Sequence, residues 1–97
     1  MGFSDEIIET VWRKGKTVEG KDPSLFRKDD CNAWMRRKEH GNRNSIFGWE
    51  VDHINPNGSD NLDNLRPLQW ENNVNKQDGK LKCPITSNGE QNTRRTL

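Results

Sequence analysis

The sequence predicts a small α+β protein built around a strand–strand–helix unit. Residues 49–54 form a short alternating run, which is the pattern of a half-buried strand. A second short run at 65–68 follows a polar turn, and Pro67 limits it to an edge or abbreviated strand. The polar segment at 70–76 has helical character. We therefore expect two small strands and a helix that face each other.

Length and composition indicate one domain with a small core. The chain has 97 residues, of which 28% are hydrophobic and 32% are charged. A chain of this size buries only about two-thirds of its unfolded surface. We expect residues 1–86 to form a single domain, with residues 49–76 at its functional centre and four tryptophans supplying much of the apolar burial. Residues 87–97 are polar and lack an apolar period, which predicts a disordered tail.

The first predicted element is a helix over residues 4–14. Ser4 is a natural N-cap, and acidic residues follow it in the first turn, where negative charge suits the helix dipole. Gly15 terminates the helix, and basic residues precede it in the last turn. The glycines and proline of residues 15–25 predict a connecting loop. This helix is expected to pack over the strand–strand–helix unit.

The next segment, residues 29–37, fits a strand or a helix, because a short apolar run is ambiguous by periodicity alone. We favour an extended segment that pairs with the strand over 46–53, with the turn between them at 41–44. Such a hairpin sets Arg36 and Arg37 on opposite faces. The fold therefore gains an extra β-hairpin segment beside the central unit.

The chemistry of the central unit lies at the ends of its elements. Asp52 and His53 close the first strand, Asn64 enters the second, and Asn73 lies on the predicted helix. The carboxylate of Asp52 and the amide oxygen of Asn73 suit a hard divalent cation that keeps several waters. The imidazole of His53 can take a proton near pH 7. When the helix folds back, these side chains could converge on one small site.

The order of these residues resembles the motif of HNH endonucleases, in which a ββα-metal finger cuts nucleic acid. The matching elements are Asp52-His53, then Asn64-Leu65 at the second strand, then Asn73-x-x-Lys76 on the helix. The wider run from Phe26 through GNRNS, GWEVDHI and PLQWENN looks like a small bacterial and phage subfamily of HNH proteins.

The resemblance implies a role for each motif residue. His53 would be the general base that deprotonates the attacking water, while Asp52 and Asn73 would be the protein ligands of a single metal. Asn64 would brace the loop between the strands and help to orient the His53 ring. Lys76 would meet a phosphate. An asparagine at the last motif position favours magnesium, with manganese as the alternative, over zinc, because amide and carboxylate oxygens suit hard ions.

Charge gives a weaker indication of a nucleic-acid partner. The 16 basic and 15 acidic residues leave a net charge of +1, so only the distribution of charge can favour DNA. Arg36 and Arg37 in the expected hairpin, and Arg43 in the polar loop before the first motif strand, are the candidates for contact with the DNA backbone. A solvated surface role is equally compatible with Arg36 and Arg37. Structural and functional roles are not separable for Arg43.

Cysteine usage excludes most zinc sites. Cys31 and Cys83 stand alone and the chain has two histidines, so a closed four-ligand zinc site is nearly excluded and no structural zinc is expected. Many HNH relatives brace the finger with two cysteine pairs, and this chain would use packing instead. Cys31 is expected to be a small buried hydrophobe, and a disulfide with Cys83 stays open. With no signal peptide and no apolar run of membrane-spanning length, we expect a reducing, cytoplasmic setting.

These observations together favour a divalent-metal-dependent DNA endonuclease that hydrolyses phosphodiester bonds with weak sequence preference. Targeting would come from a partner, such as phage or restriction machinery, and no membrane partner is expected. The alternative is a noncatalytic nucleic-acid-binding module that keeps the HNH fold. A third hypothesis, an interaction domain held by a structural metal, is weakened by the lack of soft ligands. The sequence leaves the oligomeric state and the cognate DNA open.

Overall fold

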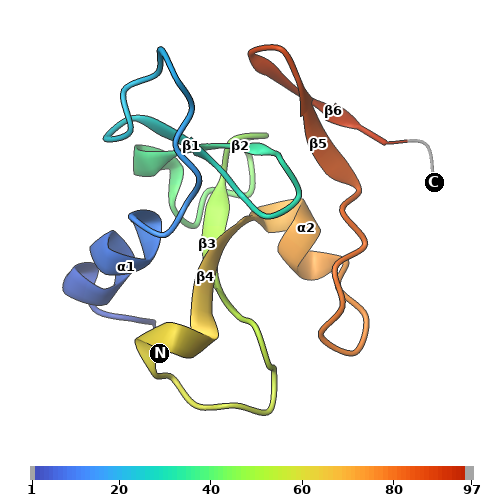
Figure 1. The fold of residues 1–97 in the computed structure, drawn as a ribbon. Helices are drawn as coiled ribbons and strands as arrows, with labels where there is room; N and C mark the ends of the chain where they lie inside the picture. The colour runs from blue at the N-terminus through green and yellow to red at the C-terminus, as the bar shows by residue number, and fades with distance from the viewer. Residues whose placement is uncertain (1, 96–97) are drawn as a thin grey trace.

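The computed structural model describes residues 2–95 and contains two helices and three antiparallel hairpins (Figure 1). The helices are α1 (Asp5–Trp12) and α2 (Trp70–Val74). The hairpins pair β1 (Phe26–Lys28) with β2 (Trp34–Arg36), β3 (Trp49–His53) with β4 (Leu65–Gln69), and β5 (Ile85–Asn88) with β6 (Gln91–Arg94). Short 3-10 turns cover Arg37–Glu39 and Leu62–Asn64. The predicted α+β class is confirmed. Neither helix in residues 2–95 is long and apolar enough to cross a membrane.

Helix α1 begins where the sequence predicted. The Ser4 hydroxyl accepts a hydrogen bond from the backbone N–H of Ile7 at 3.2 Å, which satisfies one of the free donors of the first turn. Val11 and Trp12 are fully buried at the other end of the helix. They form the core cluster together with Met35, Trp49 and Leu65. The helix is therefore anchored by its last turn against the β3–β4 hairpin.

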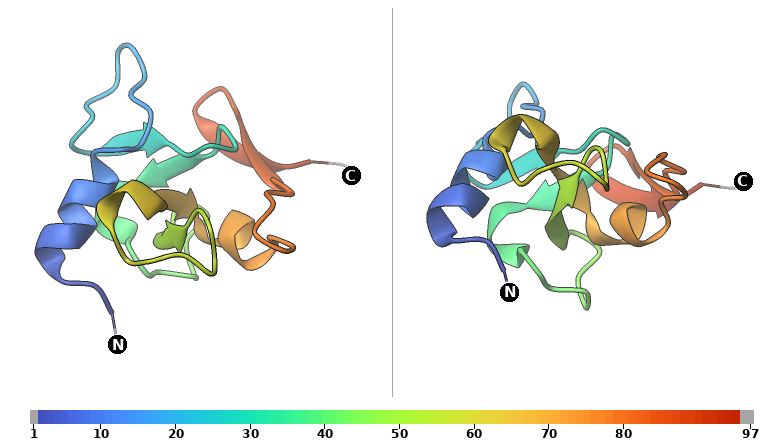
Figure 2. Two further views of the ribbon diagram at one scale, coloured as in Figure 1. Left: turned by 60° about the horizontal axis from the view of Figure 1, so that its bottom comes forward. Right: turned by 90° about the horizontal axis from the view of Figure 1, so that it is seen from below.

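The central hairpin and α2 follow each other without a loop, as predicted. Strands β3 and β4 are antiparallel, and Asp52 lies opposite Arg66. Gln69 ends β4 and caps α2, since its side-chain oxygen accepts from the N–H groups of Glu71 at 2.9 Å and Asn72 at 3.1 Å. Helices α1 and α2 lie on opposite sides of this hairpin (Figures 1 and 2). The helix ends at Val74, so Lys76 lies beyond it rather than on it.

The expected pairing of residues 29–37 with 46–53 is wrong. Strand β2 pairs instead with β1, with Arg27 opposite Met35. The chain reverses early because the Asp29 carboxylate accepts hydrogen bonds from the N–H groups of Cys31 at 2.9 Å and Ala33 at 2.8 Å. Asn32 completes the turn with a positive φ of 63°, a conformation that asparagine tolerates.

The predicted disorder of residues 87–97 is also wrong where the structure describes them, because residues 85–94 form the β5–β6 hairpin. Residues 96–97 lie outside the described part of the chain. Polar side chains hold this hairpin in place. Asn92 accepts from the Trp34 N–H at 2.6 Å and donates to the carbonyls of Trp34 at 2.9 Å and Ile46 at 3.0 Å. The Trp34 indole donates to the carbonyl of Gly89 at 2.7 Å.

A disulfide joins Cys31 and Cys83, with 5.2 Å between their Cα atoms. The sequence left this bond open, and it ties the β1–β2 turn to the segment that leads into β5. Disulfides persist mainly in oxidising compartments. The bond therefore counts against the reducing setting expected from the sequence, and the cytoplasmic location stays a prediction.

Candidate functional site

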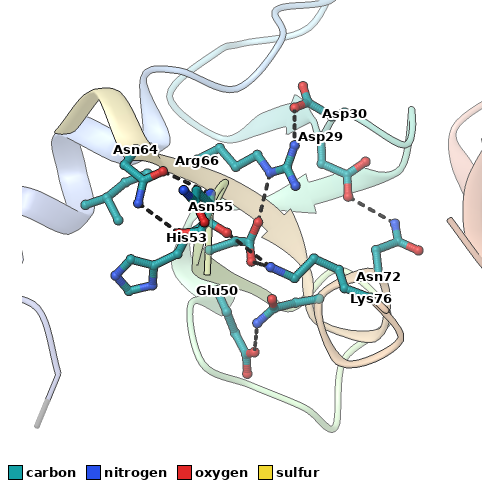
Figure 3. A network of polar contacts seen from close by, with 12 residues as sticks. Asp29, Asp30, Glu50, His53, Asn55, Asn64, Arg66, Asn72 and Lys76 are labelled. Atoms are coloured by element: carbon teal, nitrogen blue, oxygen red, sulfur yellow. Dashed lines mark hydrogen bonds and ion pairs between the residues drawn. The ribbon is translucent and has the colours of Figure 1, made fainter. Parts of the chain in front are cut away.

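The carboxylate of Asp52 is the buried centre of the site. Its side chain is only 2% exposed, and Arg66, opposite it on β4, donates from Nε to Oδ2 at 2.8 Å. Lys76 pairs through its ammonium group with Oδ1 and also donates to the carbonyl of His53 at 3.2 Å. Arg66 and Lys76 thus converge on one carboxylate (Figure 3). Two cations offset the cost of burying this charge.

Asn73 of α2 lies beside Glu50 of β3. Its side-chain N–H donates to Oε1 of Glu50 at 2.9 Å. Glu50 also accepts two hydrogen bonds from Arg43, at 2.7 and 3.0 Å. Partial burial acts to raise the pKa of Glu50, but the hydrogen bonds from Arg43 and Asn73 and the charge of Arg43 hold the pKa below its usual 4.5. Glu50 and Asp52 are two residues apart on β3 and so share a face.

His53 lies on the opposite face of β3 from Asp52. Its ring is 5.9 Å from that of Phe3, and its Nε2 is 2.6 Å from Oδ1 of Asp60. The ring points away from Lys76 in Figure 3. Since a carboxylate only accepts hydrogen bonds, Nε2 carries the proton in the neutral ring and Nδ1 is left as the acceptor. The imidazole is one-third exposed.

Asn64 braces the loop between β3 and β4. Its amide oxygen accepts from the N–H of Asn55 at 2.9 Å, and its N–H group donates to the carbonyls of Asn55 at 3.1 Å and Ser59 at 2.8 Å. A Cβ at Gly58 would lie 2.7 Å from the nitrogen of this amide, so a side chain there would displace the amide that braces the loop. No hydrogen bond within residues 2–95 joins Asn64 to the His53 ring; Asn64 holds the loop that carries Asp60.

The three candidate DNA-binding arginines differ in how they are engaged. Arg37 donates from Nε to both carboxylate oxygens of Glu9, at 2.9 and 3.2 Å, and so ties α1 to the neighbouring 3-10 turn. Arg43 is committed to Glu50. Among residues 2–95, the Arg36 guanidinium makes one contact of this kind, a long ion pair with Glu39 at 3.9 Å. Of the three, Arg36 is therefore the least constrained by protein contacts.

A polar network braces the central unit in addition to the expected packing, in which Trp49 and Leu65 belong to the hydrophobic core. Asp29 is buried, and besides its two bonds to the β1–β2 turn it accepts from the N–H of Gln69 and from the Asn72 amide, both at 3.0 Å. Asn72 continues to Ile85, donating to its carbonyl at 3.0 Å and accepting from its N–H at 2.9 Å. Burial raises the pKa of Asp29, although these hydrogen bonds oppose the shift. One carboxylate thus links the β1–β2 turn, α2 and β5.

The motif residues are therefore divided between two faces of β3. Asp52, Asn73 and Lys76 lie with Glu50 on the α2 side, while His53 lies on the α1 side beside the loop that Asn64 braces. Three residues that contact the site were not predicted from the sequence: Glu50, Arg66 and Asp60. Strand alternation from Asp52 already indicates Glu50, and the strand register identifies Arg66. No sequence signal identifies Asp60, since its position depends on the loop.

The donor chemistry on the α2 side fits a hard divalent ion. Asp52 and Asn73 offer a carboxylate and an amide oxygen, which magnesium accepts alongside several waters. Within residues 2–95, no group of three or more His, Cys, Asp or Glu side chains is arranged to hold a metal. Because Lys76 contacts Oδ1 of Asp52, a cation that binds this oxygen has to displace its ammonium group. Comparison of the chain with models of protein families, with curated proteins and with solved structures finds no match.

Proposed function

We propose that the protein is a divalent-metal-dependent DNA endonuclease of HNH type that hydrolyses phosphodiester bonds by a one-metal mechanism. The observation that supports this most is the order of side chains along the β3–β4–α2 unit. A carboxylate and a histidine end β3, an asparagine fixes the loop before β4, and an amide follows on α2. This order is the one that the resemblance to the HNH motif leads us to expect.

In this mechanism His53 activates the nucleophile. Nδ1 takes a proton from a water molecule, whose oxygen attacks phosphorus while the bond from phosphorus to the departing sugar oxygen breaks. The sugar oxygen then takes a proton from solvent. Asp60 holds the ring through Nε2 and stabilises the imidazolium that forms. A magnesium or manganese ion held by Asp52 and Asn73 would stabilise charge on the phosphate and on the departing oxygen.

Lys76 has two partners in this scheme. Without substrate it neutralises Asp52. With a cation on the carboxylate, the ammonium group would be free to contact a phosphate oxygen of DNA. Arg36 would add a second backbone contact, and contacts of this kind carry little sequence information. Weak sequence preference, and targeting by a partner such as phage or restriction machinery, follow from this proposal.

The test is conversion of supercoiled plasmid by purified protein in EDTA, magnesium or manganese. Wild-type protein should nick the plasmid only with metal, and His53→Ala should abolish nicking while its DNA affinity in EDTA stays near that of wild type. His40→Gln is the matched control, because it changes the other histidine of the chain and should nick like wild type. Equal nicking by wild type and His53→Ala would refute the assignment of the base.

A second candidate is a noncatalytic nucleic-acid-binding module with the same fold. The observation that favours it is that both oxygens of Asp52 are paired with cations while His53 lies on the other face of β3. This candidate predicts DNA binding in EDTA and no metal-dependent nicking under any condition. The same plasmid and binding assays therefore separate the two functions.

A further inference from the structure

Glu50 and Asn73 form a contact that fixes the direction of the Asn73 amide. Glu50 receives two hydrogen bonds from the Arg43 guanidinium and a third from the Asn73 side chain at 2.9 Å. A carboxylate paired with a guanidinium accepts hydrogen bonds and donates none. The N–H₂ group of Asn73 must therefore face Glu50, and its amide oxygen must face away. This orientation follows from chemistry and does not depend on how the amide atoms are assigned.

The amide oxygen that is turned away accepts no hydrogen bond from the described part of the chain. Within residues 2–95, none of the hydrogen bonds ends on Oδ1 of Asn73, whereas both oxygens of Asp52 and both of Glu50 accept one or more. Glu50 and Asp52 project from the same face of β3, and the segment over residues 73–76 crosses that face, with Asn73 on Glu50 and Lys76 on Asp52. Asn73 therefore has an oriented amide oxygen, turned away from Glu50, in the segment that crosses the carboxylate-bearing face.

Arg43 is itself held in place. Its guanidinium carbon lies 5.8 Å from the centre of the Trp70 ring, and the Trp70 indole donates to the carbonyl of Ser45 at 2.9 Å. A two-point contact between guanidinium and carboxylate fixes position as well as charge. Arg43, which the sequence offered as a DNA contact, therefore restrains Glu50 from the loop that precedes β3.

We propose that Glu50, held by Arg43, is a positioning residue that turns the Asn73 amide oxygen toward the divalent cation of the site. This inference rests on the proposed function, because Asn73 is a metal ligand there. Groups that hydrogen-bond to a ligand fix its orientation, and their loss commonly weakens metal binding by about 10- to 100-fold. Glu50 does not bind the cation itself in this arrangement, since its oxygens are occupied by Arg43 and Asn73.

The experiment measures Mn²⁺ affinity by electron paramagnetic resonance on wild-type protein, Glu50→Gln, Arg43→Gln and the control Arg94→Gln. Arg94 also pairs with a glutamate, Glu71 of α2, but away from Asn73. We expect Glu50→Gln and Arg43→Gln each to bind Mn²⁺ about tenfold or more weakly, as for loss of any group that orients a ligand, and Arg94→Gln to match wild type. Arg43 is largely exposed, so its variant should fold normally, which the urea midpoint checks.

Arg43→Gln is the decisive variant, because it removes a positive charge near a cation site. A purely electrostatic role of Glu50 predicts unchanged or tighter Mn²⁺ binding in this variant, whereas positioning predicts weaker binding. Tighter or unchanged binding would overturn the inference while leaving the proposed metal site intact. Failure of the wild-type protein to bind Mn²⁺ at all would overturn the proposed metal dependence and the inference with it.

Discussion

Replacing Asp29 by asparagine should strongly destabilise the fold. Each carboxylate oxygen of Asp29 accepts two N–H donors, and all of these groups are buried or adjoin buried residues. An asparagine keeps only one oxygen, so its N–H₂ group faces two donors whichever way the amide turns. Two unsatisfied buried donors cost about 2–6 kcal/mol together, at about 1–3 kcal/mol each. Asparagine also avoids the cost of burying a charged carboxylate, which offsets part of this penalty. We expect a net loss of about 2–4 kcal/mol in the free energy of unfolding.

Urea unfolding followed by tryptophan fluorescence measures this loss. With a slope of about 1–2 kcal/mol per molar urea for a small domain, the midpoint of Asp29→Asn should fall by about 1–3 M. The control is Asp30→Asn at the adjacent residue, whose half-exposed carboxylate makes one ion pair with Arg66 at 3.3 Å. Asp30→Asn should lower the free energy of unfolding by less than about 1 kcal/mol, as for exposed ion pairs in general. Equal midpoints for the two variants would refute the claim that Asp29 braces the fold.

Three further predictions concern acid, redox state and metal. Burial raises the pKa of Asp29 above its usual 3.8, so the part of its stabilisation that is linked to proton binding is full below that value and is lost as pH rises through the folded-state pKa. The gap in unfolding free energy between wild type and Asp29→Asn should therefore narrow from pH 3 to pH 7 without closing, because the hydrogen bonds to the carboxylate remain, and a widening gap would contradict this sign. Reducing the Cys31–Cys83 disulfide, which spans 52 residues, should cost roughly 4 kcal/mol of unfolding free energy by the loop-entropy relation, and a urea midpoint unmoved by dithiothreitol would count against it. Lys76→Met should tighten Mn²⁺ binding severalfold, because it frees an oxygen of Asp52; calorimetry that shows weaker Mn²⁺ binding would show that Lys76 does not compete with the cation.

The elements that the sequence predicted well are those decided by local signals. The Ser4 cap begins α1 as predicted, although the helix ends at Trp12 rather than at residue 14. The alternating run over residues 49–54 marks β3, which ends at His53. The helical segment after the second strand was also expected, because Gln69 and Trp70 follow β4 directly. Its end at Val74 was missed, since nothing local distinguishes the last turn of a short helix from the loop after it.

The parts that could not be predicted depend on single polar side chains acting over long distances. Asn92 bonds the backbone of Trp34 across 58 residues, and Asp29 reaches Asn72 across 43. Such contacts leave no periodic pattern in the sequence. The polar segment that forms the β5–β6 hairpin therefore cannot be distinguished from a disordered tail by its sequence. The pairing of β2 with β1 has the same cause, because the Asp29 carboxylate fixes the turn between them.

In the candidate site, too, local sequence predicts the residues but not their contacts. The motif identifies Asp52, His53 and Asn73, but each of them contacts a residue that only the fold brings close. Arg66 meets Asp52 through strand register, and Asp60 meets His53 through a braced loop. Sequence order can therefore predict which residues belong to a site, while the contacts between them depend on tertiary structure.

The most direct test of the central claim is the cleavage rate of a labelled DNA duplex under single-turnover conditions with magnesium, for wild type and His53→Ala, with and without added imidazole. If His53 takes the proton of the attacking water, the variant should lose cleavage while retaining DNA affinity, and imidazole should restore part of the rate. Metal-dependent cleavage at an equal rate in both proteins, or no cleavage by the wild-type protein, would contradict the account.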